Sequence, residues 1–329
     1  MTRFAYVRAK TVVAAVETMA NTPGAKFLGG GTNLVDLIRA DIEHPDTLID
    51  ITPLPLTGIE ELPAGGLRIG ALAKNSHVAA HPRIRTRYPV LTQAILAGAS
   101  GQLRNMATVG GNLLQRTRCH YFYDTATQCN KRTPGEGCTA LNGGHNRNHA
   151  ILGTSPHCIA THPSDLSVAL TALDAVVETE STNGRRRIPV RDFHRPPGTT
   201  PDVETALHQH ELITAVELPQ LPPATNSHFR KVRDRASYAF ALVSVAAAMK
   251  VEDGRVADVR IALGGVATHP WRARTAESVL RDAPATEAAF REAAEAELAT
   301  AVTRPDNAFK APLAIRTLTA TLAGLVRPR

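Results

Sequence analysis

The amino-acid sequence predicts a mixed α+β fold, with two small α/β units in the N-terminal part and a separate α+β domain at the C-terminus. Short segments with strand character alternate with helical segments up to about residue 220, and this alternation is typical of α/β units. The proline-containing segment Gln220 to Thr225 then precedes a group of strands that is followed by helices. A length of 329 residues also favours more than one domain.

The first unit covers about residues 1–55. We expect a helix over Thr11 to Met19, a strand over Lys26 to Leu28, a helix over Leu34 to Arg39 and a strand over Leu48 to Ile51. Three glycines separate the first of these strands from the helix after it. A glycine turn is therefore predicted at a strand-to-helix junction.

The second unit covers residues 56–220 and contains a long interruption. Its expected elements are strands over Leu67 to Ala71, Ala175 to Glu180 and Leu212 to Leu218, and helices over Asn75 to Ala80, Tyr88 to Ala99 and Asp165 to Leu173. Between them, residues 119–163 show no periodicity and contain every cysteine of the chain. A structureless loop of this length is usually functional, or is held by something other than an apolar core.

The C-terminal part, residues 225–329, has the pattern of an α+β domain. Its expected strands are His228 to Val232, Ala241 to Val251 and Val256 to Leu263, and Ser237 to Phe240 connects the first two. Its expected helices are Glu277 to Leu280, Glu287 to Thr300 and Phe309 to Leu325.

The charge pattern favours an anionic cofactor or an acidic redox partner over nucleic acid. The net charge is +7, but the basic residues are scattered and no nucleic-acid-binding motif accompanies them. No apolar stretch approaches the ~18–20 residues that a membrane helix needs, so membrane insertion is not expected. The N-terminus lacks the apolar core of a signal peptide. We therefore expect cytoplasmic synthesis, and a periplasmic location only if a partner subunit supplies the signal.

The first glycine turn, Leu28-Gly29-Gly30-Gly31-Thr32-Asn33, has the chemistry of a pyrophosphate-binding loop. Glycines let backbone N–H groups approach phosphate oxygens, and Thr32 or Asn33 can cap the next helix or bond a phosphate. A tight turn with an N-cap explains the same residues. The spacing departs from Gly-x-Gly-x-x-Gly, which disfavours a Rossmann nicotinamide site.

A second turn, within Gln102 to Asn112, combines a glycine pair with hydroxyl and amide side chains. Such a loop can bond phosphate or ribose while its backbone lies against a ligand, although a satisfied surface turn has the same composition. Two glycine-rich turns in two α/β units fit an extended dinucleotide that lies between the units.

The four cysteines, Cys119, Cys129, Cys138 and Cys158, all lie in the aperiodic segment. Four thiolates are the number that a Zn²⁺ ion or an iron–sulfur cluster needs, and the absence of a signal peptide disfavours disulfides. The gaps of nine, eight and nineteen residues match neither a zinc pair nor a ferredoxin run, so spacing leaves the metal open. No histidine is assigned to the metal, because histidines in a polar loop are more often hydrogen-bonded surface residues. Those in or beside this loop are His120, His145, His149, His157 and His162.

Taken together, the motifs resemble the FAD-binding subunits and domains of the xanthine dehydrogenase, or molybdenum hydroxylase, family. The stretches that carry the likeness are Phe27 to Leu34, Ala107 to Cys119 and Cys158 to Leu166, and the likeness extends over essentially the whole chain. The sequence is most similar to the flavin subunit of bacterial periplasmic-type aldehyde oxidoreductases. The resemblance implies a two-subdomain FAD-binding domain (PCMH or vanillyl-alcohol-oxidase type) over residues 1–220, then a CO dehydrogenase flavoprotein-like domain over 225–329.

The resemblance also implies a set of FAD-binding residues. The pyrophosphate would be wrapped by Leu28, Gly29, Gly30, Gly31, Thr32, Asn33 and Leu34, and phosphate and ribitol would be bonded by Thr108, Gly111 and Asn112. Asp165 would bond the sugar or ribityl region, Ile213 would pack near a ring of FAD, and Lys231 would approach the cofactor. Without the resemblance, Ile213 reads as a strand core residue, Asp165 as an N-cap and Lys231 as a solvated charge.

For the cysteines, the resemblance implies a [4Fe–4S] cluster in place of zinc. It implies an electron-transfer subunit of an aldehyde oxidoreductase, with a molybdenum-cofactor-binding large subunit and a small [2Fe–2S] subunit as partners. An external acceptor, such as a ferredoxin-like protein, would take the electrons. No side chain here is expected to act as acid, base or nucleophile. The alternatives are the flavin subunit of a hydroxybenzoyl-CoA reductase and, outside enzymes, a zinc-stabilised binding protein.

Overall fold

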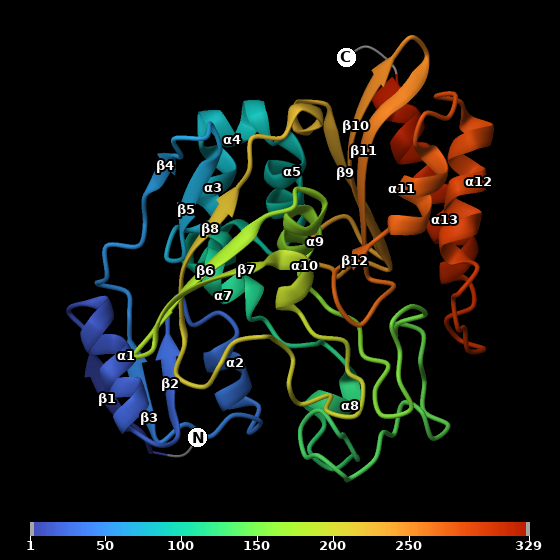
Figure 1. Ribbon diagram of the computed structural model, residues 1–329. Coiled ribbons are helices and arrows are strands. Elements are labelled where there is room, and N and C mark those ends of the chain that lie inside the picture. The colour runs from blue at the N-terminus through green and yellow to red at the C-terminus, as the bar shows by residue number, and fades with distance from the viewer. Residues whose placement is uncertain (1–2, 327–329) are drawn as a thin grey trace.

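The computed structural model describes residues 3–326 and contains three β-sheets with helices packed on them (Figure 1). The N-terminal unit is a small parallel sheet in the order β1-β3-β2, with the helices in the connections. Its elements are β1 (Ala5–Arg8), α1 (Val12–Asn21), β2 (Ala25–Leu28), α2 (Leu34–Arg39) and β3 (Thr47–Asp50). Thr11 begins α1 because its side chain accepts a hydrogen bond from the backbone N–H of Ala14 at 3.0 Å.

The second unit is a five-stranded antiparallel sheet in the order β4-β5-β8-β6-β7. Its strands are β4 (Ile59–Glu61), β5 (Leu67–Gly70), β6 (Val176–Ser181), β7 (Gly184–Pro189) and β8 (Leu212–Leu218). Its helices are α3 (Asn75–Ala80), α4 (Pro82–Arg87), α5 (Pro89–Ala97), α6 (Gly101–Met106), α7 (Val109–Leu113), α9 (Asp165–Ala172) and α10 (Val190–Phe193). The central strand β8 is buried along its whole length.

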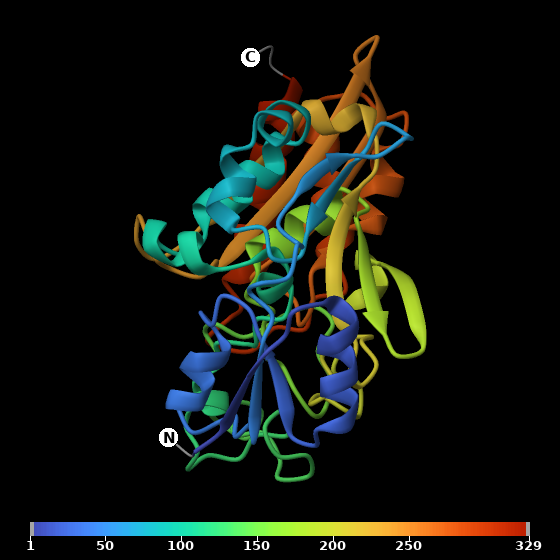
Figure 2. The same cartoon turned by 90° about the vertical axis from the view of Figure 1, so that its left-hand side faces the viewer.

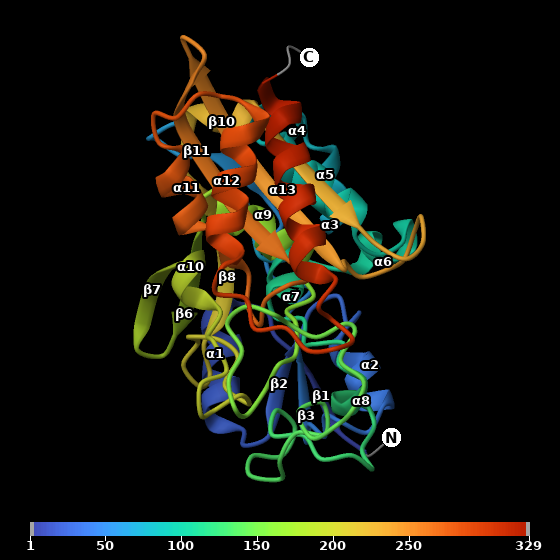
Figure 3. The same ribbon diagram turned by 90° about the vertical axis from the view of Figure 1, so that its right-hand side faces the viewer.

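The C-terminal part is a four-stranded antiparallel sheet, β12-β11-β10-β9, covered by three helices on its outer face (Figure 3). The short 3₁₀ turn η1 (Pro222–Thr225) leads into β9 (Ser227–Val232), β10 (Val243–Glu252), β11 (Arg255–Gly264) and β12 (Trp271–Arg272), and α11 (Arg274–Leu280), α12 (Glu287–Leu298) and α13 (Lys310–Val326) follow. Along β10, Val245 and Ala247 pack against these helices, and Ala246 packs on the core of the second unit. Both faces of this sheet are therefore covered.

We call residues 119–163 the cysteine loop. Its regular structure is the single turn α8 (His120–Tyr123), and two isolated bridges, Cys129↔Cys138 and Leu152↔Ala267, order the rest. Figure 2 shows the N-terminal sheet and this green loop at one end of the molecule, with most of the C-terminal domain at the other. The loop packs against α2, where Leu37 contacts the cluster of Phe122 and Cys129.

The predicted fold class is confirmed, and every helix and strand expected from periodicity is present within a few residues of its expected bounds. The sequence prediction missed elements that are short or exposed, which are β1, β4, β7, β12, α4, α6, α7, α8 and α10. Strand β1, for example, is exposed at all four positions and therefore has no burial alternation to detect. Among residues 3–326, no helix combines the length and the apolar character that a membrane crossing requires.

Candidate functional site

A cavity of about 720 Å³ lies where the three parts of the chain meet. This volume falls in the range of ~300–1,000 Å³ that is typical of cofactor and ligand sites. Its walls come from the start of α2, the end of α5, the loop and turn around α7, the cysteine loop, and the β9–β10 connection. Of the predicted FAD-binding residues, those that line it are Thr32, Asn33, Gly111, Asn112, Asp165 and Lys231, and of the predicted metal ligands Cys119 also lines it.

The second half of the first glycine turn, Thr32 and Asn33, lines the cavity. Gly31 has a positive φ of 72°, and this backbone conformation directs the chain into α2. Asn33 is fixed there because its Oδ1 accepts a hydrogen bond from the backbone N–H of Arg116 at 2.9 Å. The other predicted residues of this turn, Leu28, Gly29, Gly30, Gly31 and Leu34, do not line the cavity, and their contact with a pyrophosphate stays a prediction.

Gly30 is required by a contact between the two glycine-rich turns. A Cβ on Gly30 would lie 2.0 Å from the carbonyl oxygen of Met106, in the segment that leads into the second turn. The two turns therefore touch through their backbones at this point. A larger residue at position 30 would separate them, so such a substitution perturbs the packing of both turns as well as any phosphate contact.

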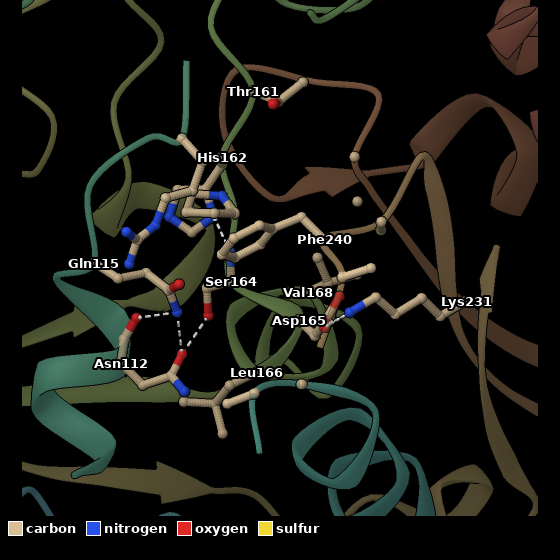
Figure 4. Close-up of a pocket in the computed structure, with 18 of the residues that line it drawn as sticks. Asn112, Gln115, Thr161, His162, Ser164, Asp165, Leu166, Val168, Lys231 and Phe240 are labelled. Carbon is tan, nitrogen blue, oxygen red and sulfur yellow. Dashed lines mark hydrogen bonds and ion pairs between the residues drawn. The ribbon is translucent and has the colours of Figure 1, made fainter. Parts of the chain in front are cut away.

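The second turn forms the short helix α7. Thr108 is its N-cap and accepts a hydrogen bond from the backbone N–H of Gly111 at 3.2 Å. Thr108 is buried and does not line the cavity, so the structure shows it as a capping residue beneath Gly111 and Asn112. Asn112 faces the cavity, and its Oδ1 accepts hydrogen bonds from Gln115 Nε2 and Ser164 Oγ, both at 2.7 Å (Figure 4).

A buried ion pair connects the second unit to the C-terminal domain at the cavity wall. Lys231 Nζ lies 2.7 Å from Asp165 Oδ2, and both side chains are buried (Figure 4). Burial raises the pKa of Asp165, and the ammonium group of Lys231 opposes this shift. Ser164 caps α9, so Asp165 is the first residue of the helix and its carboxylate is free to meet Lys231. Lys231 is therefore not the solvated charge that the sequence alone suggests.

Ile213 lies in the core. It belongs to β8, is 4% exposed and packs beneath Gly110 of α7. It does not line the cavity, and its predicted contact with a ring of FAD stays a prediction.

The sequence prediction missed several residues that line the cavity, among them Arg118, His162 and Phe240. The guanidinium group of Arg118 lies 5.4 Å from the centre of the Phe240 ring and forms an ion pair with Asp36 at 2.9 Å. Phe240 comes from the β9–β10 connection, and Figure 4 shows its ring directed toward the polar residues of the site. Arg118 and His162 lie in stretches that carry the family resemblance, but nothing in the sequence marked Phe240.

The cavity wall contains unpartnered polar groups. Buried side-chain atoms that find no hydrogen-bond partner among the described residues belong to five cavity-lining residues. These atoms are Asn33 Nδ2, Asn75 Oδ1, Arg118 Nε, His149 Nδ1 and His162 Nε2. Unsatisfied buried groups are uncommon because each costs free energy, so a polar ligand is the simplest partner for them. Among them, Asn33 Nδ2 and Arg118 Nε are hydrogen-bond donors, which suits an anionic dinucleotide.

The four cysteines line a second, smaller cavity together with backbone and side chains of the same loop. All four thiols are free, and Cys129 and Cys158 are buried. Burial raises the pKa of Cys119 to about 12 and also raises the pKa of Cys138 and Cys158. Within residues 3–326, no three His, Cys, Asp or Glu side chains stand at metal-binding geometry. The donor chemistry of the cavity nevertheless fits a thiolate-bound metal.

Comparison with known proteins defines the class. Residues 2–221 match the family of FAD-binding domains in molybdopterin dehydrogenase, and residues 227–322 match the CO dehydrogenase flavoprotein C-terminal domain. The chain therefore belongs to the FAD-binding subunits of the molybdenum hydroxylase family, which are oxidoreductase subunits. This membership contradicts the non-enzyme alternative and confirms the predicted family.

Individual relatives cover nearly all of the chain. It is 53% identical over 325 residues to the aldehyde oxidoreductase FAD-binding subunit PaoB of Escherichia coli, with 98% of each chain covered. It is 27% identical to the glyceraldehyde dehydrogenase medium chain of Sulfolobus acidocaldarius, over 83% of this chain and 79% of that one. Its fold matches a carbon monoxide dehydrogenase from Hydrogenophaga pseudoflava with a TM-score of 0.75 at 25% identity, covering 98% of this chain and 96% of the other.

Proposed function

We propose that this chain is the FAD- and [4Fe–4S]-containing electron-transfer subunit of a molybdenum-dependent aldehyde oxidoreductase. The observation that carries the proposal is that a cofactor-sized cavity and a four-cysteine cavity share two wall residues, Cys119 and His149. The near-full-length likeness to an aldehyde oxidoreductase subunit supports an aldehyde as the substrate of the complex. The same likeness favours this assignment over the hydroxybenzoyl-CoA reductase alternative.

FAD would occupy the larger cavity across both glycine-rich turns. Thr32, Asn33, Gly111 and Asn112 present hydroxyl, amide and backbone groups at one side, where phosphate and ribitol would bind. The Asp165–Lys231 pair would fix the distance between α9 and β9 and so position the opposite wall. When bound, FAD supplies two-electron chemistry, and the chain's residues orient it and exclude water from it.

The four cysteines would hold the cluster. Burial holds the pKa of Cys119, Cys138 and Cys158 above their ordinary value, and a bound cation would favour the thiolate forms that ligate it. Four cysteines would supply one thiolate for each iron of a [4Fe–4S] cluster. With both cofactors in neighbouring cavities, the chain could pass electrons between them over a short distance.

The rest of the reaction would belong to partner subunits. The oxidation of the aldehyde would occur on a molybdenum-binding large subunit. A small [2Fe–2S] subunit would deliver the electrons, and an external acceptor such as a ferredoxin-like protein would remove them. In this proposal residues 1–220 form the FAD-binding domain with a subdomain boundary near residue 55, and residues 225–329 form the C-terminal domain.

The test is a cofactor count on the anaerobically purified complex and on a matched complex that carries Cys158→Ala. We expect FAD in both complexes, and a loss of about four iron atoms and four sulfides from the variant, as one [4Fe–4S] cluster requires. The partner's own iron is present in both samples and cancels in the difference. Stoichiometric zinc with no change in iron or sulfide would contradict the cluster assignment, and absence of FAD from both would contradict the flavin assignment.

A further inference from the structure

Two residues form the boundary between the flavin cavity and the cysteine cavity. Cys119 and His149 are the residues that line both cavities. Their side chains are in contact, because Cys119 Sγ lies 3.1 Å from His149 Nε2. The imidazole ring is 3% exposed and therefore lies inside the molecule. The sequence alone assigned His149 to the ordinary surface histidines, and the structure places it in the wall instead.

The proton of the ring can be assigned from its surroundings. A neutral imidazole has one N–H donor. Nδ1 has no hydrogen-bond partner among the described residues, whereas Nε2 faces the sulfur. If Cys119 is a metal-bound thiolate it can only accept, so Nε2 must be the donor.

The C-terminal domain holds His149 in this position. Lys310, at the start of α13, is fully buried and donates from Nζ to the carbonyl oxygens of His149 at 3.0 Å and Gly265 at 2.7 Å. The ring of Tyr121 stacks on the imidazole with a centroid distance of 6.1 Å and an interplanar angle of 20°. Lys310 thus fixes the backbone of His149 and Tyr121 fixes its ring. The contact between Nε2 and the sulfur is therefore held by the surrounding fold.

We infer that His149 is a positioning residue that donates its Nε2–H to the sulfur of Cys119 and thereby raises the reduction potential of the cluster. The inference rests on the proposed function. A hydrogen bond to a ligating sulfur stabilises the reduced cluster more than the oxidised one, because reduction adds negative charge near the sulfurs. The residue also keeps that sulfur against the flavin cavity. Because Lys310 of the C-terminal domain holds His149, this domain influences the reduction potential of the cluster, although all four cysteine ligands lie outside it.

The experiment compares three variants in the purified complex. His149→Phe removes the donor and keeps a planar ring, whereas His149→Gln keeps a side-chain N–H donor. His157→Phe is the matched control, because His157 also lines the cysteine cavity but makes no described hydrogen bond to a sulfur. The potential of this chain's cluster is measured by redox titration with EPR detection, and the signal that disappears in Cys158→Ala identifies that cluster. FAD, iron and sulfide are counted in each sample.

In His149→Phe we expect the equilibrium between reduced and oxidised cluster to shift about tenfold toward the oxidised form, which is about 59 mV lower in potential for a one-electron couple. In His149→Gln we expect a smaller decrease, and in His157→Phe no change. An unchanged potential in His149→Phe with full iron content would overturn this inference and leave the proposed function intact. Loss of the cluster from both His149 variants would also overturn it, since the residue would then be structural. A wild-type complex without this cluster would overturn both proposals.

Discussion

The C-terminal domain and the cysteine loop hold their shapes by different means. In the C-terminal domain, β10 and β11 pack against α11, α12 and α13 through a large apolar core that includes Met249, Phe290 and Leu318. In the cysteine loop, a small separate cluster contains Phe122, Cys129 and Leu37 of α2, and only Ile151 and Leu152, near the end of the loop, join the C-terminal core. The part of the loop before residue 150 buries little apolar surface, so packing alone offsets little of its conformational entropy.

Polar contacts supply part of what the loop lacks. Arg116, just before the loop, forms ion pairs with Glu43 at 2.8 Å and with Glu204 at 2.6 Å, and its guanidinium group lies 4.7 Å from the centre of the Phe122 ring. Lys131, inside the loop, forms a third ion pair with Glu204 at 2.7 Å. The comparison shows that the first part of the loop depends on ion pairs and on any group that the four cysteines bind, whereas the C-terminal domain depends on an apolar core that also takes in Ile151 and Leu152 of the loop.

The largest expected effect is in the apolar region. Phe290→Ala removes a ring that is 1% exposed, and we expect the unfolding free energy of the C-terminal domain to decrease by about 3–5 kcal/mol. Val302→Ala, at an exposed position, is the control and should change it by less than about 0.5 kcal/mol. Chemical denaturation followed by circular dichroism measures both. A similar small loss in the two variants would show that the domain does not depend on this core.

A smaller effect is expected when the polar attachment of the loop is broken. Glu204→Gln removes the charge that pairs with Arg116 and Lys131, and we expect local stability to fall by about 1–3 kcal/mol. Deuterium uptake in residues 119–163 measures this loss. Glu136→Gln, at an exposed position of the same loop, is the matched control and should leave uptake unchanged. Equal uptake in the two variants would contradict a role for the ion pairs.

The stabilisation of the cysteine loop by the ion pairs of Glu204 should also depend on pH. Burial tends to raise the pKa of Glu204, but Lys131 and Arg116 outweigh burial and hold the pKa below its ordinary value. A lowered folded-state pKa means that the stabilisation is present above the unfolded value of ~4.3 and is lost as the pH falls through the folded value. The difference in uptake between wild type and Glu204→Gln should therefore be full at pH 7 and shrink below about pH 4. A difference that grew on acidification would refute the assignment.

The smallest predicted effect concerns the flavin cavity. Asn33→Asp keeps the oxygen that accepts from Arg116 N–H but replaces the unpartnered Nδ2 donor with a carboxylate oxygen. If FAD phosphate binds beside Asn33, we expect affinity for FAD to fall about tenfold, or about 1.4 kcal/mol. Reconstitution of flavin-free complex with FAD measures it, and Asn183→Asp in the exposed β6–β7 turn is the control. An unchanged affinity for FAD in Asn33→Asp would show that Asn33 does not lie beside the FAD phosphate.

Periodicity predicted those elements that bury one or both faces, and it failed where burial gives no local signal. Strand β8 was predicted because all of its positions are buried, whereas β1 is exposed and was missed. Motifs marked some of the residues that line the cavity, such as Asn33 and Asn112, and their contact with FAD stays a prediction. Residues such as Phe240 and His149 were missed as site residues because their roles arise from tertiary contacts between segments that are far apart in sequence.

The most direct test is whether iron bound by the cysteines holds residues 119–163 in place. Deuterium uptake is measured in the purified complex before and after removal of iron by a chelator under anaerobic conditions, with β10 and β11 as the internal reference. We predict that uptake in the cysteine loop rises strongly once iron is removed, while uptake in β10 and β11 stays the same, because their apolar core needs no metal. A loop that is equally protected with and without iron would contradict this explanation.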